Sequence, residues 1–385
     1  LISSLYPIAK ALSETVIRFA EAFAQAKKEK LWLDFNDYEH FALQILTEPG
    51  STKDNIIPTD AAKQMQQKYD EIMIDEYQDM SRPRYELIRA LRLQHDFSLF
   101  CVGDDWQSIY RFAGSDLHLI LDFDRIWRAW GPTRMFQITT TRRFRQSLID
   151  ASGAFVMRDT NLYVKHLNNP SDKKDYSLKA LGGHTEEERF NVIVEQLRKL
   201  PKTASVLLLG RYRSDINLMI RCDQDGLFSI DQSTGNIRFL EKPDMDIRFM
   251  TAHASKGLQC DFVFLLCCSG GLKGFPSTIP EEPLLGLLLP EVERCPHAEE
   301  RRLFYVAMTR CKKKLFFIVD QTRPSRFMYE LHSKICPNIF RGVKLPPQCP
   351  NCGEALSLRH NRNDPNRSFY GCTGFPNCRY TQQAK

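Results

Sequence analysis

The chain has 385 residues, which is enough for two or three domains that each bury a sizeable core. It is 43% hydrophobic and 26% charged. It has no apolar run of the roughly 18 residues that a membrane helix needs, so neither a membrane-spanning protein nor a membrane partner is expected. The net charge of +6 hints at a polyanionic partner, although so small an excess is also typical of a solvated basic surface. Most of the twelve cysteines lie in apolar segments, which favours a reducing, cytoplasmic compartment.

The first third of the chain predicts two helices followed by a strand–helix–strand unit. Residues 1–33 carry apolar side chains at spacings of three and four and end in lysines, as in a long amphipathic helix. A second helix is expected from an N-cap at Asp34 or Asn36 to about residue 45. The apolar run 72–74 predicts a strand buried on both faces, residues 82–93 a helix, and residues 97–102 a second strand, which together indicate a parallel sheet within residues 34–133.

A second α/β domain is expected over residues 134–340, followed by a small cysteine-containing tail over residues 345–385. Short apolar runs separated by helical or loop lengths of sequence mark its strands: 135–138, 206–209, 247–250, 262–268 and 315–319. The predicted fold class is therefore α/β, with two parallel-sheet domains and a small C-terminal module.

An acidic pair, Asp75 and Glu76, ends the first predicted strand, which is where parallel α/β sheets place their chemistry. A carboxylate at this position can hold Mg²⁺ against nucleotide phosphates, and its neighbour can orient and deprotonate a water molecule. The alternative is an acidic turn that closes a core strand. The pair alone does not decide between the two.

Five segments decide it, because they occur in the order of motifs II to VI of the UvrD/Rep-like superfamily 1 DNA helicases. They are IMIDEYQD (72–79), VGDDWQSIYRFAG (102–114), TTTRRFRQS (139–147), FMTAHASKGLQCDFVFL (249–265) and EERRLFYVAMTR (299–310), spread over more than 230 residues. The chain thus resembles this family. The resemblance implies two RecA-like domains, of which the first is incomplete here, with ATP between them; residues 1–33 would be a helical segment of an accessory region of the first domain.

The resemblance also implies the residues that handle ATP and Mg²⁺. Asp75 would hold Mg²⁺ and Glu76 would activate the attacking water. Further residues would contact the nucleotide or its γ-phosphate: Gln107, Phe144, Arg145, Gly257, Gln259 and Arg310, with Phe144 stacking on adenine and Arg310 as the arginine finger. Phe144 lacks the hydroxyl of the family's Tyr, and Gln259 replaces a common Glu, so the sugar contact is the weakest part of the assignment.

The DNA-binding residues implied by the resemblance are aromatic. Tyr110, Phe112 and His253 lie at family DNA-contact positions, although Ala113 stands where an Arg is usual. Single-stranded DNA and single-strand/duplex junctions are the expected partners, with other DNA-repair or replication proteins as further ones. Typical relatives insert an accessory domain between the strands predicted at 206–209 and 247–250, and fewer than forty residues separate those strands here, so this domain is expected to be absent or vestigial.

A phosphate-cradling P-loop requires Gly-Lys followed by Ser or Thr, and no Gly in this chain is followed by Lys. Since the chain also begins with Leu1, we expect a C-terminal fragment whose further partner is the N-terminal part of the same protein. We expect the fragment alone to be inactive as an ATPase.

The tail holds two cysteine pairs, Cys349/Cys352 and Cys372/Cys378, at a spacing typical of a closed tetrahedral Zn²⁺ site. The pattern resembles the four-cysteine zinc ribbons of bacterial topoisomerase I. Arg367, Phe369 and Tyr370 suggest a basic, aromatic surface for single-stranded DNA, and a purely structural ribbon is the alternative.

The expected function is an ATP-dependent DNA helicase that moves 3′ to 5′ along single strands in the bacterial cytoplasm, associated with the nucleoid. One alternative is a helicase-like ATPase that remodels a complex such as RNA polymerase. A non-catalytic nucleic-acid-binding module is the other, and the retained carboxylates and arginines argue against it.

Overall fold

We describe a computed structural model of the chain, covering residues 2–52, 55–93, 97–170, 177–282, 286, 289–290, 293, 295–361 and 364–384. The chain divides into two compact units, and each is described separately. Unit 1 comprises residues 1–75 and 80–102, and unit 2 comprises residues 76–79 and 103–385. Within the described ranges no helix is both long and apolar enough to cross a membrane.

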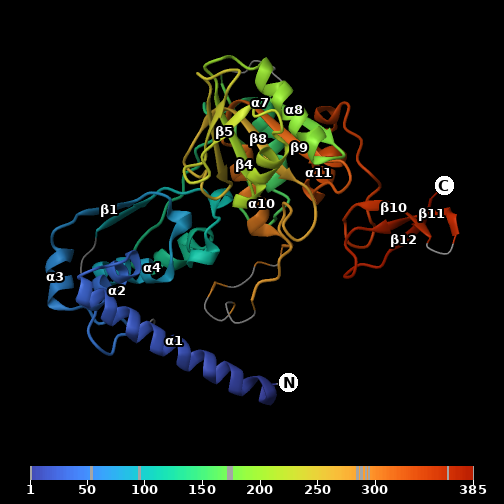
Figure 1. Ribbon diagram of the computed structural model, residues 1–385. Coiled ribbons are helices and arrows are strands. Elements are labelled where there is room, and N and C mark those ends of the chain that lie inside the picture. Colours follow the sequence, from blue (N-terminus) through green and yellow to red (C-terminus); the bar gives the residue numbers. More distant parts are fainter. Residues whose placement is uncertain are drawn as a thin grey trace. The chain divides into compact units, whose positions relative to one another are not determined.

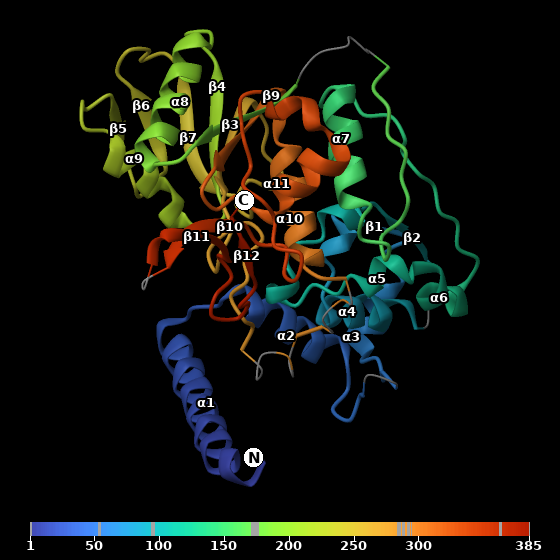
Figure 2. The same ribbon diagram turned by 90° about the vertical axis from the view of Figure 1, so that its right-hand side faces the viewer.

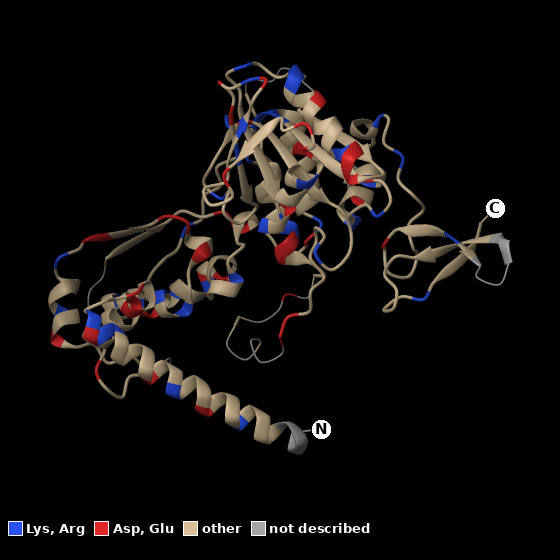
Figure 3. Ribbon diagram, in the orientation of Figure 1, with Lys and Arg blue, Asp and Glu red and all other residues tan. Residues whose placement is uncertain are grey.

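Unit 1 is mainly helical. Its elements are α1 (Ile2–Lys30), α2 (Phe35–Leu46), α3 (Asp60–Gln66), β1 (Glu71–Ile74), α4 (Arg82–Arg92) and β2 (Ser98–Cys101). The predicted first two helices are confirmed, and blue and red segments alternate along α1 (Figure 3). Asp34 caps α2 through a reciprocal capping box with Asp37, and Lys27 reaches both carboxylates, at 2.9 and 2.6 Å.

The two strands of unit 1 pair in parallel, with Glu71 opposite Ser98 and Ile74 opposite Cys101, as predicted. The prediction that the first strand is buried on both faces is wrong. Met73 is 70% exposed and Phe100 is 54% exposed, whereas their neighbours along each strand are partly buried. A parallel sheet is buried on both faces only when layers cover both, and the described residues cover one face of this two-stranded sheet.

Unit 2 is built on a seven-stranded sheet with the order β3-β9-β8-β4-β7-β6-β5. The strands are β3 (Leu178–Gly183), β4 (Ser205–Gly210), β5 (Phe228–Ile230), β6 (Asn236–Phe239), β7 (Asp246–Thr251), β8 (Cys260–Cys268) and β9 (Cys311–Asp320). The helices are α5 (His118–Leu121), α6 (Phe123–Trp127), α7 (Gln146–Val156), α8 (Glu186–Lys199), α9 (Asn217–Cys222), α10 (Ala298–Met308) and α11 (Arg326–Glu330). The first five strands in that order are parallel, and β6 and β5 extend the sheet as an antiparallel hairpin (Figure 1).

The sheet of unit 2 separates two hydrophobic cores. In β4, Val206 and Leu208 belong to the core beneath α8 and α9, whereas Leu207 and Leu209 belong to the core beneath α7, α10 and α11. Figure 2 shows these two groups of helices on opposite sides of the strands. Alternate side chains of a strand point to opposite faces, so a continuous apolar run is what a doubly covered strand requires.

The four predicted strands at 206–209, 247–250, 262–268 and 315–319 are confirmed as β4, β7, β8 and β9. The predicted strand at 135–138 is wrong. These residues form no regular element, and Phe136 and Ile138 are more than 80% exposed, so no neighbouring strand or helix buries the run. The interval between β4 and β7 contains α9 and the hairpin β5–β6, which joins the main sheet.

Residues 103–133 pack with unit 2, although the sequence analysis assigned them to the first domain. Trp106, Ile109 and Leu117 lie in the same core as Phe155 and Phe304. The tail forms a three-stranded antiparallel sheet of β10 (Leu356–Asn361), β11 (Asp364–Cys372) and β12 (Thr381–Gln383). The structure is therefore mixed α/β, with a large mainly parallel sheet and a small C-terminal ribbon.

Candidate active site

The acidic turn after β1 is held in place by Gln78. Gln78 is almost fully buried, its amide nitrogen donates to the Glu76 carboxylate, and its amide oxygen accepts from the backbone N–H of Asp104 at 2.8 Å. Glu76 has a left-handed backbone, with φ of 52°, and its side chain is 58% exposed. A non-glycine residue in this conformation is costly, and such strain occurs preferentially at functional sites. The turn thus presents the Glu76 carboxylate to solvent with one oxygen oriented by an amide.

Lys256, which the sequence analysis did not single out, joins the turn to two other motifs. Its ammonium group lies 2.6 Å from an oxygen of Asp79, 3.5 Å from an oxygen of Glu76 and 3.0 Å from the carbonyl oxygen of Gln107, and only 7% of the side chain is exposed. It also lies 5.1 Å from the centre of the Tyr110 ring. A sequence signal existed, because Lys256 is the one cation in the turn that follows β7.

Gln107 and Arg310 come together from residues about two hundred apart in the chain. The Arg310 guanidinium lies 3.5 Å from the Gln107 side-chain oxygen and donates to the carbonyls of Val306 at 2.8 Å and Leu258 at 3.4 Å. Burial, and then the neighbouring Arg143, lower the pKa of Arg310 to about 10, so the group remains charged at neutral pH. A fixed cation beside an amide suits contact with an anionic oxygen.

Tyr110, Phe112 and His253 form an aromatic group beside these residues. The Phe112 and His253 rings are 5.4 Å apart edge to face, the Tyr110 and Phe112 rings are 6.0 Å apart, and the Tyr110 hydroxyl donates to the His253 carbonyl at 3.3 Å. Phe112 is 61% exposed. Burial, and then the charge of Arg211, lower the pKa of His253 to about 4, so its ring is neutral at pH 7. The structure thus brings the three predicted DNA contacts of the core into one cluster.

The remaining predicted nucleotide residues are less concentrated. Phe144 is only 6% exposed and packs in the core, so its ring offers no open face for stacking. Arg145 is half-buried at the start of α7. Gly257 has φ of 82°, in the left-handed region that favours glycine, and the next residue but one, Gln259, is half-buried. Asp75 is exposed and belongs to unit 1.

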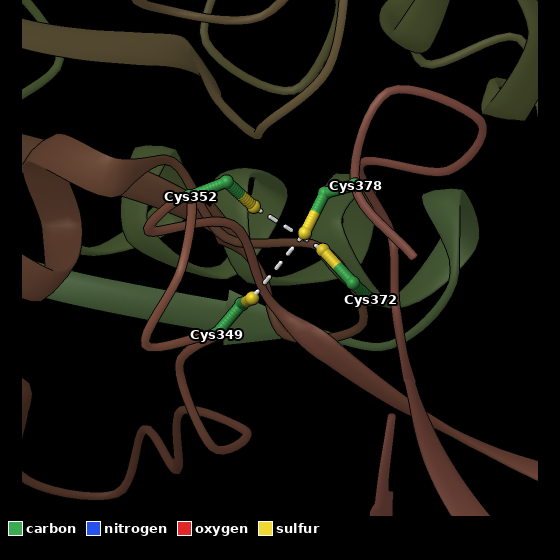
Figure 4. Close-up of side chains that lie close together, drawn as sticks. All are labelled: Cys349, Cys352, Cys372 and Cys378. Atoms are coloured by element: carbon green, nitrogen blue, oxygen red, sulfur yellow. Dashed lines mark hydrogen bonds between the residues drawn. The ribbon is translucent and has the colours of Figure 1, made fainter. Parts of the chain in front are cut away.

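The four cysteines of the ribbon converge on a common centre (Figure 4). Their sulfur atoms all lie within 4.8 Å of one another, with Cys349 and Cys378 3.7 Å apart and Cys352 and Cys372 3.3 Å apart. Bonds of about 2.3 Å from four thiolates to one zinc ion place neighbouring sulfurs about 3.8 Å apart, so the cluster fits tetrahedral Zn²⁺. Burial opposes ionisation of Cys349, but backbone N–H groups of Cys352 and Asn351 donate to its sulfur and lower its pKa.

The predicted DNA-binding residues of the ribbon lie on β11. Tyr370 packs against the cysteine cluster, and Phe369 is half-buried opposite Arg359. The Arg367 side chain lies outside the described residues. The most exposed aromatic side chain among the described residues of the ribbon is Phe375, at 60%, which the sequence analysis did not select.

Comparisons with known proteins agree with this geometry. The UvrD/REP helicase N-terminal domain matches residues 3–127, the UvrD-like helicase C-terminal domain matches residues 230–322, and the topoisomerase DNA binding C4 zinc finger matches residues 347–385. DNA helicase IV of Escherichia coli (strain K12) is 33% identical over 261 residues, which are 67% of this chain and 35% of that protein. An ATP-dependent helicase/nuclease of Clostridioides difficile (strain 630) is 45% identical over 120 residues, which are 31% of this chain and 9% of that protein.

The chain thus spans about a third of the length of DNA helicase IV and less of the other relative. The matches follow the same order along the chain as the motifs and the cysteine cluster. The protein is homologous to DNA helicase IV and carries UvrD-like helicase N- and C-terminal domains followed by a topoisomerase-type C4 zinc ribbon.

Proposed function

We propose that these residues act in an ATP-dependent DNA helicase that moves 3′ to 5′ along single-stranded DNA and unwinds duplex. The observation that carries the proposal is the position of Lys256, which contacts Asp79, the backbone of Gln107 and the ring of Tyr110. One buried cation thereby joins the residues assigned to the nucleotide to an aromatic residue assigned to DNA. The direction of movement rests on the family resemblance alone.

In this proposal Glu76 orients the attacking water, and Gln107 and Arg310 contact the γ-phosphate, with Arg145 as a further cation. The exposed, amide-oriented carboxylate of Glu76 and the fixed guanidinium of Arg310 fit these roles. Asp75, at the end of β1, would hold Mg²⁺, which neutralises phosphate charge when bound. Gly257 and Gln259 would line the sugar side, and Phe144 would reach adenine only by leaving the core.

On the DNA side, the exposed face of Phe112 would stack on a base, with Tyr110 and His253 supporting its ring. Arg367, Phe369 and Tyr370 would give the ribbon a second single-strand contact. We propose single-strand/duplex junctions as the substrate and the bacterial nucleoid as the location.

We further propose that the 385-residue chain alone hydrolyses ATP poorly, because none of its glycines precedes a lysine and no P-loop is present. The test measures DNA-stimulated ATP hydrolysis by this chain and by a longer chain that supplies a Gly-Lys phosphate loop, each with and without Glu76→Gln. We expect activity only in the longer chain, with a loss of at least a hundredfold on Glu76→Gln.

Robust hydrolysis by the 385-residue chain, abolished by Glu76→Gln, would overturn the proposed inactivity. Activity of the longer chain that survives Glu76→Gln would overturn the role of Glu76. Unwinding of a junction with a 3′ single-stranded tail separates a helicase from an ATPase that only remodels protein complexes, since the latter hydrolyses ATP without separating strands.

A further inference from the structure

A cavity of about 320 Å³ lies in unit 2 at the beginning of α10, where the core meets the ribbon. We call it the junction cavity. Its charged and polar lining residues include Arg158 after α7, Arg301 on α10, Arg326 and Glu330 on α11, Lys334, and Gln348 at the start of the ribbon. Arg310 follows the other end of α10, nine residues beyond Arg301, or about 13 Å along the helix. The cavity is therefore separate from the residues assigned to ATP.

The junction cavity carries an excess of positive charge. Four cations and one carboxylate line it, which gives a net charge of +3 among the described residues. Glu330 accepts from Arg301 at 2.8 Å and lies 3.0 Å from Arg158, so a single carboxylate serves two guanidinium groups. Arg301 is 6% exposed, and its Nε–H lacks a hydrogen-bond partner among the described residues. Buried donors normally find acceptors, so this wall of the cavity can accept an anionic oxygen.

His297 reports the same positive field. It lies immediately before α10, and the Arg326 guanidinium contacts its Nε2 atom. Burial, followed by the charges of Arg326 and Arg301, lowers the pKa of His297 to about 4. The ring is neutral at pH 7, so it adds no charge and removes none.

The cavity is fixed to the ribbon on one side. The Arg326 guanidinium also donates to the carbonyl of the zinc-site residue Cys352, and the Tyr329 hydroxyl donates to the Pro346 carbonyl at 2.9 Å. Arg323 donates to the Thr373 carbonyl at 3.0 Å. These bonds hold the first turn of the ribbon against α11, and Gln348 forms part of the cavity wall.

We propose that the junction cavity binds a phosphate group of a single strand that runs between the ribbon and the helicase core. Planar guanidinium groups match phosphate oxygens in pairs, and a volume of about 300–1,000 Å³ is usual for a binding cavity. The phosphate chemistry rests on the cavity alone, and the assignment of that phosphate to a DNA strand rests on the function proposed above. The ribbon is then a second anchor whose strand path is continued by the core.

The test uses the zinc-loaded 385-residue chain and the double variant Arg158→Ala, Lys334→Ala. Both side chains line the cavity and neither bonds to the ribbon in the described structure. The matched control is Lys199→Ala, Lys202→Ala at the end of α8, which also removes one ion-paired and one exposed cation. Each protein must retain one zinc ion. The probes are inorganic phosphate, followed by calorimetry, and an oligothymidylate with a 5′-hydroxyl end, titrated at several salt concentrations.

We expect the cavity variant to lose phosphate binding and to bind the oligonucleotide about 3- to 10-fold more weakly than the control at 0.1 M salt. Its slope of log affinity against log salt should be shallower by about 0.7–1.4, because one or two counterion-releasing contacts are gone. Equal phosphate binding by the two variants would overturn the cavity as a phosphate site. Loss of phosphate binding with unchanged oligonucleotide affinity and slope would overturn the strand assignment.

If the wild type binds no oligonucleotide but its phosphate binding depends on Arg158 and Lys334, the DNA function fails while the phosphate site stands. The two proposals therefore fail in different ways.

Discussion

The Lys256→Met substitution tests the joint between the motifs most directly. It keeps the length of the side chain but removes the ammonium that lies 2.6 Å from Asp79, and Asp79 is only 19% exposed. Breaking a buried ion pair by removing one partner costs about 3–5 kcal/mol, and the partial exposure of Asp79 reduces this. The lost contact with the Tyr110 ring adds about 0.5–2 kcal/mol. We expect unit 2 to lose about 2–4 kcal/mol of unfolding free energy.

The assay is urea unfolding followed by tryptophan fluorescence in a Trp32→Phe background, because the three remaining tryptophans then all lie in unit 2. Asp79→Asn and the double variant complete a cycle, with an expected coupling of about 1–3 kcal/mol. Lys256→Arg is the control that keeps the charge. A coupling below about 0.5 kcal/mol would refute the view that Lys256 and Asp79 act as a pair.

Three further outcomes follow from the same contacts. Phe112→Ala should weaken single-strand binding by about 1–3 kcal/mol in a filter or anisotropy titration while leaving the melting temperature unchanged, since the ring is 61% exposed; an unchanged affinity would remove it from the DNA surface. Cys372→Ser, or chelation, should release zinc and unfold the ribbon, detected by a colorimetric zinc assay and by loss of the ribbon amide signals; a folded ribbon without metal would contradict the site. His253 resists protonation down to about pH 4 in the native state, whereas the unfolded chain takes up the proton near pH 6.5. The unfolding free energy should therefore fall as pH drops through this window, by about 1–3 kcal/mol for this group, and His253→Gln should flatten that part of the profile measured by urea titration.

The sequence predicts the parts of the fold that depend on local pattern. β4, β7, β8 and β9 were predictable because a strand covered on both faces must be apolar throughout its length. The zinc site was predictable because metal ligands have fixed spacings along the chain. β3 was missed because it is an edge strand that contains Lys179 and ends in two glycines, and edge strands need less apolar sequence. The hairpin β5–β6 was missed for a similar reason, since its buried residues alternate with polar ones.

The site itself was only partly predictable. Motif order places Gln107, Arg310 and His253 correctly near their partners, but no pattern within the sequence states that Phe144 would be buried. Burial of one ring depends on helices distant in the chain, and that information lies in the tertiary packing. Lys256 was missed because its partners are about 150 and 180 residues away, and an isolated lysine in a turn is usually a solvated surface residue.

The alternation of side chains along β8 has a consequence for how unit 2 loses its structure. Val263 and Leu265 lie in the core beneath α10, and Phe264 and Leu266 lie in the core beneath α8. Detachment of this central strand would expose both cores together, so neither layer of helices can melt while the other remains native. The helix that precedes Arg310 and the helices on the opposite face of the sheet therefore share a single unfolding equilibrium, and damage on the side remote from the nucleotide residues lowers the population of the arginine's working arrangement.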